Sequence, residues 1–113
     1  MSASDALRAG VPLLTSPGDT FVSRMAASVL HAAGLDDCVL PDRDAVVARA
    51  IALGADAPAR AALRERVAKA VRDSGLFDPP AFARDLERLY AAMHAQALAG
   101  ERSMIVLEPS PRP

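Results

Sequence analysis

The sequence is short of the residues that rigidify a small domain or give it reactive chemistry. It has one cysteine, Cys38, so neither an internal disulfide nor a cysteine-based metal site can form, and we expect Cys38 to be a small half-buried hydrophobe. Tryptophan is absent and aromatic residues make up only 4%. A core of Ala, Leu and Val contributes less apolar area per residue than one with large rings. We therefore expect one small domain of modest stability from these 113 residues.

An excess of either charge is also missing. The chain has 13 basic and 14 acidic residues, a net charge of −1, and Lys69 is its only lysine. General binding to nucleic acid or to an anionic membrane needs a clustered positive excess, so neither partner is expected. The segment after Pro58 is rich in arginine, but Glu65 and Asp73 interrupt it. A solvated helix face is therefore favoured there over a nucleic-acid patch.

Long apolar runs and catalytic groupings are absent as well. No stretch approaches 18 apolar residues, and no basic region followed by an apolar run opens the chain. A cytoplasmic location is predicted. No Ser/His/Asp grouping, paired-carboxylate spacing or His-x-x-x-His pair is present, and His31 and His94 are predicted surface residues. The residues alone therefore indicate no catalytic and no metal-binding residue.

The sequence does contain clear helix and turn signals. Residues 2–5 have the form of a capping box, and the helix that they open should end at Gly10. Residues 11–15 are a short apolar run typical of a buried parallel strand, and residues 39–40 predict a second, very short one. Between them, a helix capped by Asp19 or Thr20 should end at Gly34.

Three further helices are predicted. One begins at Asp42 or Asp44, one opens at Pro58 and breaks near Ser74, and one follows Asp78 and ends near Gly100. Residues 101–113 are predicted to be a loosely attached, proline-containing tail. The predicted fold class is therefore α/β and helix-dominated, with one or two short parallel strands and four to five helices. Unpaired strand edges would favour self-association or a partner lobe.

The order of several motifs is specific. The run SDALRAGVPLLTSPGDTFVSRMAAS covers residues 4–28, and AAGL, LG, ALR, LFD and LERLY follow at consistent spacing up to Met93. In this order they resemble the C-terminal catalytic lobe of the O-GlcNAc transferase family, the family 41 glycosyltransferases, which includes SPINDLY-like proteins. The resemblance implies a Rossmann-like lobe of the GT-B fold in residues 1–100.

The resemblance also implies a site. The family carries a His-Thr-Thr run at a helix N-terminus that is expected to hold the phosphates of a UDP-sugar, and an aspartate expected to bind the ribose. Asp5 matches that aspartate, Ser2 takes the place of the second threonine, and Met1 that of the first. Ser2 and Asp5 are thus the predicted donor-binding residues, although both also fit a simple helix cap.

The resemblance covers roughly the last third of the catalytic region. The family's phosphate-neutralising lysines and catalytic histidine would lie upstream, and Arg8 and His94 each replace a usual tryptophan. An N-terminally truncated reading frame, a relic or a wrongly assigned start would each give this pattern. The implied function is the C-terminal part of a UDP-GlcNAc-dependent protein O-glycosyltransferase, inactive alone and without a cofactor beyond its donor. The competing hypothesis is a non-catalytic helical module that binds another protein.

Overall fold

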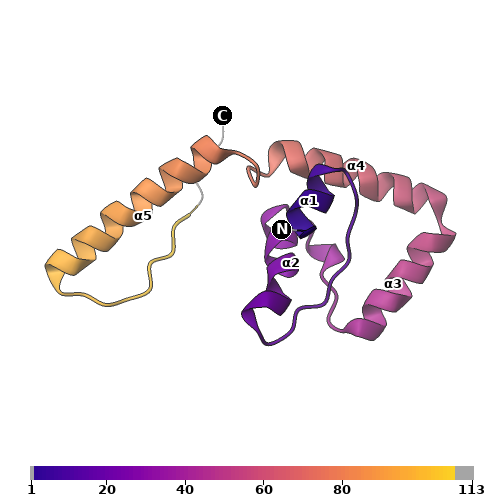
Figure 1. Ribbon diagram of the computed structural model, residues 1–113, viewed down its shortest axis with the longest axis horizontal. Helices are drawn as coiled ribbons and strands as arrows, with labels where there is room; N and C mark the ends of the chain where they lie inside the picture. The colour runs from indigo at the N-terminus through magenta and orange to yellow at the C-terminus, as the bar shows by residue number, and fades with distance from the viewer. Residues whose placement is uncertain (1, 109–113) are drawn as a thin grey trace. The chain divides into compact units, whose positions relative to one another are not determined.

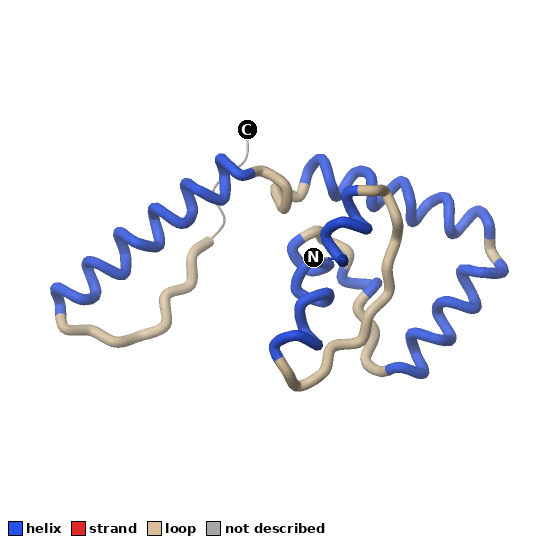
Figure 2. The backbone as a smooth tube through the Cα atoms, viewed as in Figure 1, coloured by secondary structure: helices blue, strands red, loops and turns tan. Residues whose placement is uncertain are grey.

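The computed structural model describes residues 2–108 and is dominated by helices (Figures 1 and 2). The elements in chain order are α1 (Ser2–Arg8), α2 (Phe21–Ala32), the 3₁₀ turn η1 (Asp36–Cys38), α3 (Arg43–Ala55), α4 (Ala57–Asp73) and α5 (Pro79–Ala99). The chain divides after Phe77 into two compact units, one with α1 to α4 and one with α5 and the residues that follow it. The predicted dominance of helices is confirmed.

Side chains that accept hydrogen bonds from free helical N–H groups set where most helices begin. Thr20 precedes α2, and its Oγ1 accepts from the Ser23 N–H while the Ser23 Oγ accepts from the Thr20 N–H. Asp42 and Asp78 cap α3 and α5 in the same way, as predicted. Helix α4 begins before Pro58, where the sequence predicts its start, and is capped by Asp56.

The core of the first unit lies where α1, α2, η1 and α4 meet. Its fully buried side chains are Leu7, Leu30, Leu35, Cys38 and Val67, each at most 2% exposed. Leu13, Leu14, Val39, Leu76 and Phe77 pack around them partly buried. Cys38 is thus more deeply buried than expected, and this burial raises the pKa of its thiol.

The predicted parallel strands are not formed within residues 2–108. Residues 11–15 and 39–40 instead meet in one isolated parallel bridge between Thr15 and Val39. The Thr15 N–H donates to the Cys38 carbonyl at 3.0 Å, and the Leu40 N–H donates to the Thr15 carbonyl at 2.7 Å. The pairing does not extend, because the Cys38 N–H donates to the Leu35 carbonyl within η1 at 3.0 Å and Pro17 has no N–H to donate on the other side of the bridge. Without strands in this part of the chain, the predicted sheet edge for association has no support.

The second unit pairs α5 with the chain that follows it. Gly100, with φ of +69°, ends α5 in the left-handed conformation, where a side chain would be strained. Residues 101–108 then run back along α5, so this part of the predicted tail is ordered against the helix (Figure 1). The prolines at 109, 111 and 113 lie outside the described residues.

Candidate functional site

The first candidate site is the exposed beginning of α1. Ser2 is the first helical residue, and Asp5 lies in the first turn. Both side chains are exposed. Because Ser2 is itself the first helical residue, it does not occupy the cap position that the sequence predicts for it. Met1 lies outside the described residues. The first N–H groups of a helix have no partner within it and, with the helix dipole, favour an anionic group nearby.

Leu7 fixes this turn to the rest of the unit. It is 1% exposed and is the buried residue of α1, which packs against α2 and α4. Gly10, with φ of +73°, closes the helix as predicted, and the Val11 N–H donates to the Ala6 carbonyl at 2.9 Å. The Arg8 guanidinium lies 5.3 Å from the centre of the Phe77 ring, a cation–π distance. Arg8, which replaces the family's usual tryptophan, therefore still contacts an aromatic ring.

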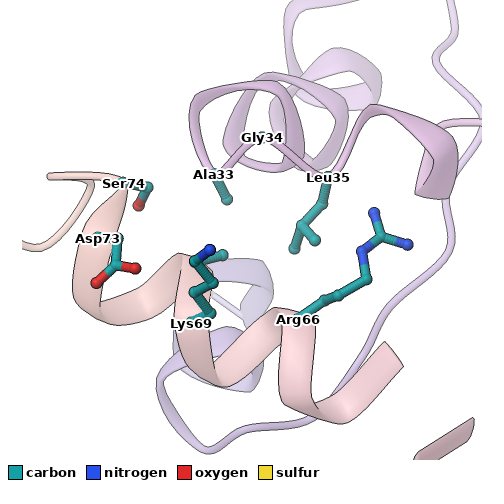
Figure 3. Close-up of a pocket in the computed structure, with 8 residues that line it drawn as sticks. Ala33, Gly34, Leu35, Arg66, Lys69, Asp73 and Ser74 are labelled. Carbon is teal, nitrogen blue, oxygen red and sulfur yellow. The ribbon is translucent and has the colours of Figure 1, made fainter. Parts of the chain in front are cut away.

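The second candidate is a pocket of about 360 Å³ between the end of α2 and the second half of α4. The residues that line it are Ala33, Gly34, Leu35, Arg66, Lys69, Ala70, Asp73 and Ser74. Figure 3 shows the side chains of Arg66 and Lys69 extending from α4 toward residues 33–35. Because the C-terminal carbonyls of a helix carry partial negative charge, a lysine beside the end of α2 is electrostatically favourable without any ligand.

The Arg66 guanidinium, at one side of this pocket, is held in an ion pair. Arg66 binds the Asp37 carboxylate through two hydrogen bonds, of 2.8 and 2.5 Å, across 29 residues of sequence. The hydrogen bond from Arg66 holds the pKa of Asp37 below its usual value, and Asp37 in turn raises the pKa of Arg66. Arg66 is therefore committed to joining α4 to η1. With Asp73 also on the rim, the pocket has no positive excess for an anionic ligand.

This ion pair predicts a pH-dependent part of the stability. Because the folded-state pKa of Asp37 is lowered from 3.8, its contribution is present above about pH 4 and is lost as the pH falls through the lower folded value. Both side chains are nearly half exposed, so we expect a contribution of about 0.5–1 kcal/mol. Urea unfolding at a pH above 4 and at a pH below the folded-state pKa of Asp37 should show that Asp37→Asn and Arg66→Gln lose less stability on acidification than the wild type. Equal losses in all three proteins would contradict the assignment.

The other predicted polar residues are engaged in local structure. Thr20 caps α2 with Ser23, while Asp19 is an exposed neighbour of the cap. His31 Nδ1 lies 2.5 Å from Asp36 Oδ1, a contact between the end of α2 and η1 that sequence periodicity does not indicate. His94 is an exposed residue of α5, as predicted.

A smaller concavity lies along α2 itself. Phe21, Arg24, Met25, Ser28 and Val29 line about 320 Å³ there, and Phe21 is 77% exposed. Neither of these pockets contains Ser2 or Asp5. Within residues 2–108 no group of three His, Cys, Asp or Glu side chains could hold a metal ion, and no helix has the length and apolar character to cross a membrane.

Comparison with known proteins identifies the first unit. The sequence model of glycosyl transferase family 41 matches residues 1–86, which include α1 to α4 and the start of α5. The chain belongs to glycosyl transferase family 41. It is 37% identical over 89 residues, 79% of its length, to the UDP-N-acetylglucosamine--peptide N-acetylglucosaminyltransferase of Caenorhabditis elegans. That alignment spans 8% of the relative, so this family 41 chain corresponds to a small part of a much longer protein.

The family match includes both candidate sites, and their charges and exposure distinguish them. It begins at residue 1 and therefore includes the first turn of α1, where Ser2 and Asp5 are exposed together. It also includes the pocket between α2 and α4, but there the charged side chains are balanced and Arg66 is bound to Asp37. The turn of α1 is the better candidate for a ligand contact.

Proposed function

We propose that this chain is the C-terminal part of a UDP-GlcNAc-dependent protein O-glycosyltransferase, and that α1 contributes to its donor site. The observation that carries the proposal is the family match through residues 1–86, together with two exposed oxygen-bearing side chains in the first turn of α1. In the whole family protein this region would help present the sugar donor to a Ser or Thr hydroxyl of the acceptor protein.

The chemistry of the two side chains fits a nucleotide. The Ser2 hydroxyl donates a hydrogen bond to a phosphate oxygen, and the Asp5 carboxylate accepts from the hydroxyls of the ribose. The helix dipole at the start of α1 also favours an anionic group such as the same phosphate. No metal or cofactor enters the proposal, since the donor itself supplies the transferable sugar.

The finer fold belongs to the same proposal. We take residues 1–100 as part of a Rossmann-like lobe of the GT-B fold, in which the bridge between Thr15 and Val39 extends into short parallel strands when neighbouring strands are available. The proposed location of the protein is the cytoplasm.

The 113-residue chain alone should bind UDP weakly and should not transfer sugar. Its only lysine, Lys69, lies on α4 beside the end of α2 and not in α1, so the first turn of α1 offers a diphosphate hydrogen-bond donors but no lysine to neutralise its charge. Stabilisation of a leaving UDP normally needs cationic groups held against it. We expect a Kd for UDP near 1 mM, which corresponds to roughly −4 kcal/mol.

Titration calorimetry with UDP tests this function. Asp5→Asn should weaken binding by about tenfold or more, because a hydrogen bond to a charged acceptor contributes about 1.5–3 kcal/mol. Asp19→Asn is the matched control, an exposed aspartate beside the cap of α2, and it should leave the affinity unchanged.

Two outcomes would overturn the proposal. One is the absence of any heat at millimolar UDP, and the other is an equal loss in Asp5→Asn and Asp19→Asn. Either result would remove α1 from the donor site.

A further inference from the structure

The chain that follows α5 is bound to it at both ends. The Gln96 side chain donates to the Ser103 carbonyl at 3.3 Å and to the Ser103 Oγ at 2.7 Å. The Arg88 guanidinium, which also binds Asp85, donates to the Glu108 carbonyl at 3.2 Å. These contacts lie beyond residue 86, where the family match ends.

The segment between these two anchors has two different faces. Ile105 and Leu107 are half-buried, whereas Met104 and Val106 are 87% and 72% exposed. This alternation is that of an extended chain with one side against a surface and the other toward solvent. We call residues 101–108 the strap.

Helix α5 has little else to stabilise it. None of its residues is buried, and Phe82, Tyr90, Met93 and Leu98 are 49–78% exposed. Because most helical stability in proteins comes from tertiary packing, a helix with no buried residue gains order from a segment bound along it. Within the strap, the apolar side chains that are partly shielded from solvent are those of Ile105 and Leu107.

One residue sends the strap back along α5. The Gly100 N–H donates to the Ala97 carbonyl at 3.2 Å and the Glu101 N–H donates to the Gln96 carbonyl at 3.0 Å. Gly100 sits at φ +69° with open space around it, so a side chain there meets no neighbour but strains the backbone. If this turn opens, the strap can leave its own helix.

We propose that the strap binds α5 interchangeably in cis and in trans, so that two copies of the chain form a dimer by exchanging residues 101–108. The strap in trans makes the same contacts with Arg88 and Gln96 as in cis. Only the turn at Gly100 then decides between monomer and dimer. The exposed apolar side chains of α5 give the dimer an additional surface to bury that the monomer leaves in water.

The short connection between α5 and the strap sets the protein concentration at which exchange between two chains occurs. A strap joined by a turn this short has an effective concentration near the millimolar range, so the wild type should be monomeric at micromolar concentration. Opening the turn at Gly100 weakens binding of the strap to its own α5 but does not change the contacts that it makes with α5 of a second copy. Gly100→Val should therefore shift dimer formation to at least tenfold lower protein concentration.

Light scattering on size-fractionated full-length chains tests the proposal. The hinge variant Gly100→Val is compared with Gly54→Val, a glycine of α3 that also has open space but no positive φ, which should stay monomeric. Adding Ile105→Asp and Leu107→Asp to Gly100→Val should abolish the dimer, because both place a charge on the half-buried face. Adding Met104→Asp and Val106→Asp should leave the dimer in place, because these side chains already face solvent.

Hydrogen exchange of the α5 amides distinguishes exchange of the strap from its simple release. In the Gly100→Val dimer these amides should stay as protected as in the wild type, and in the Ile105→Asp, Leu107→Asp variant they should exchange at least about tenfold faster. A Gly100→Val chain that stays monomeric over the whole concentration range overturns the proposal. So does a dimer that survives the two aspartates at positions 105 and 107.

Discussion

Replacing Leu30 by alanine should unfold a large fraction of the first unit. Leu30 is 0% exposed and belongs to the core cluster between α2 and its neighbours. Truncating a fully buried leucine costs about 2–5 kcal/mol, which is comparable to the whole stability of a small domain. Urea unfolding followed by circular dichroism should show this loss, and the melting temperature should fall by at least about 10 °C.

Val22→Ala is the control for this prediction. Val22 lies on the same helix and is 77% exposed, so the change should alter the free energy of unfolding by no more than about 0.5 kcal/mol. A Leu30→Ala protein as stable as Val22→Ala would show that the core is not where the structure places it.

Leu7→Ala should have the second largest effect, and it should lower both the free energy of unfolding and the affinity for UDP. Leu7 is the buried side chain of α1, and α1 is only seven residues long. A helix that short does not persist in water without tertiary contacts. We expect a loss of about 2–5 kcal/mol and, at temperatures where α2 and α4 remain folded, loss of UDP binding because the first turn of α1 no longer holds Ser2 and Asp5 together.

Leu98→Ala removes the same atoms from a side chain that is 78% exposed, and it should change neither property. Thermal unfolding and UDP titration of both variants make the comparison. Retention of UDP binding by a destabilised Leu7→Ala chain would mean that the nucleotide contacts another part of the molecule.

Local signals account for what the sequence predicted well. The caps Thr20, Asp42 and Asp78 act on N–H groups three residues away, and the glycines at positions 10 and 100 end helices by their own backbone conformation. Such interactions need no knowledge of the tertiary fold. The helices and most of their ends were therefore predictable from neighbouring residues alone.

Contacts between distant residues were not predictable in this way. The Arg66–Asp37 ion pair spans 29 residues, and nothing in the spacing of either residue indicates the other. The strand predicted at residues 11–15 is not shown within residues 2–108, where a single bridge forms, because apolar character favours a strand only when neighbouring strands complete the pairing. The strap was missed since its order comes from two side chains of α5 and not from its own sequence.

The candidate site was predictable only through the family resemblance. A serine and an aspartate three residues apart at a helix start also fit an ordinary cap, so the residue types alone do not single out a donor site; in the structure both are exposed and Ser2 is the first helical residue. The family match through residue 1 confirms the resemblance, while the role of Ser2 and Asp5 stays a proposal.

Mapping the amides that respond to UDP by nuclear magnetic resonance tests the central claim most directly. With isotope-labelled full-length chain and UDP at millimolar concentration, the proposed donor site predicts that the largest chemical-shift changes fall on the amides of residues 2–5 and that Asp5→Asn removes them. The amides of residues 33–35 and 69–74, around the pocket between α2 and α4, should not respond. Changes centred on that pocket, or no changes in α1, would contradict the assignment of α1 to the donor site.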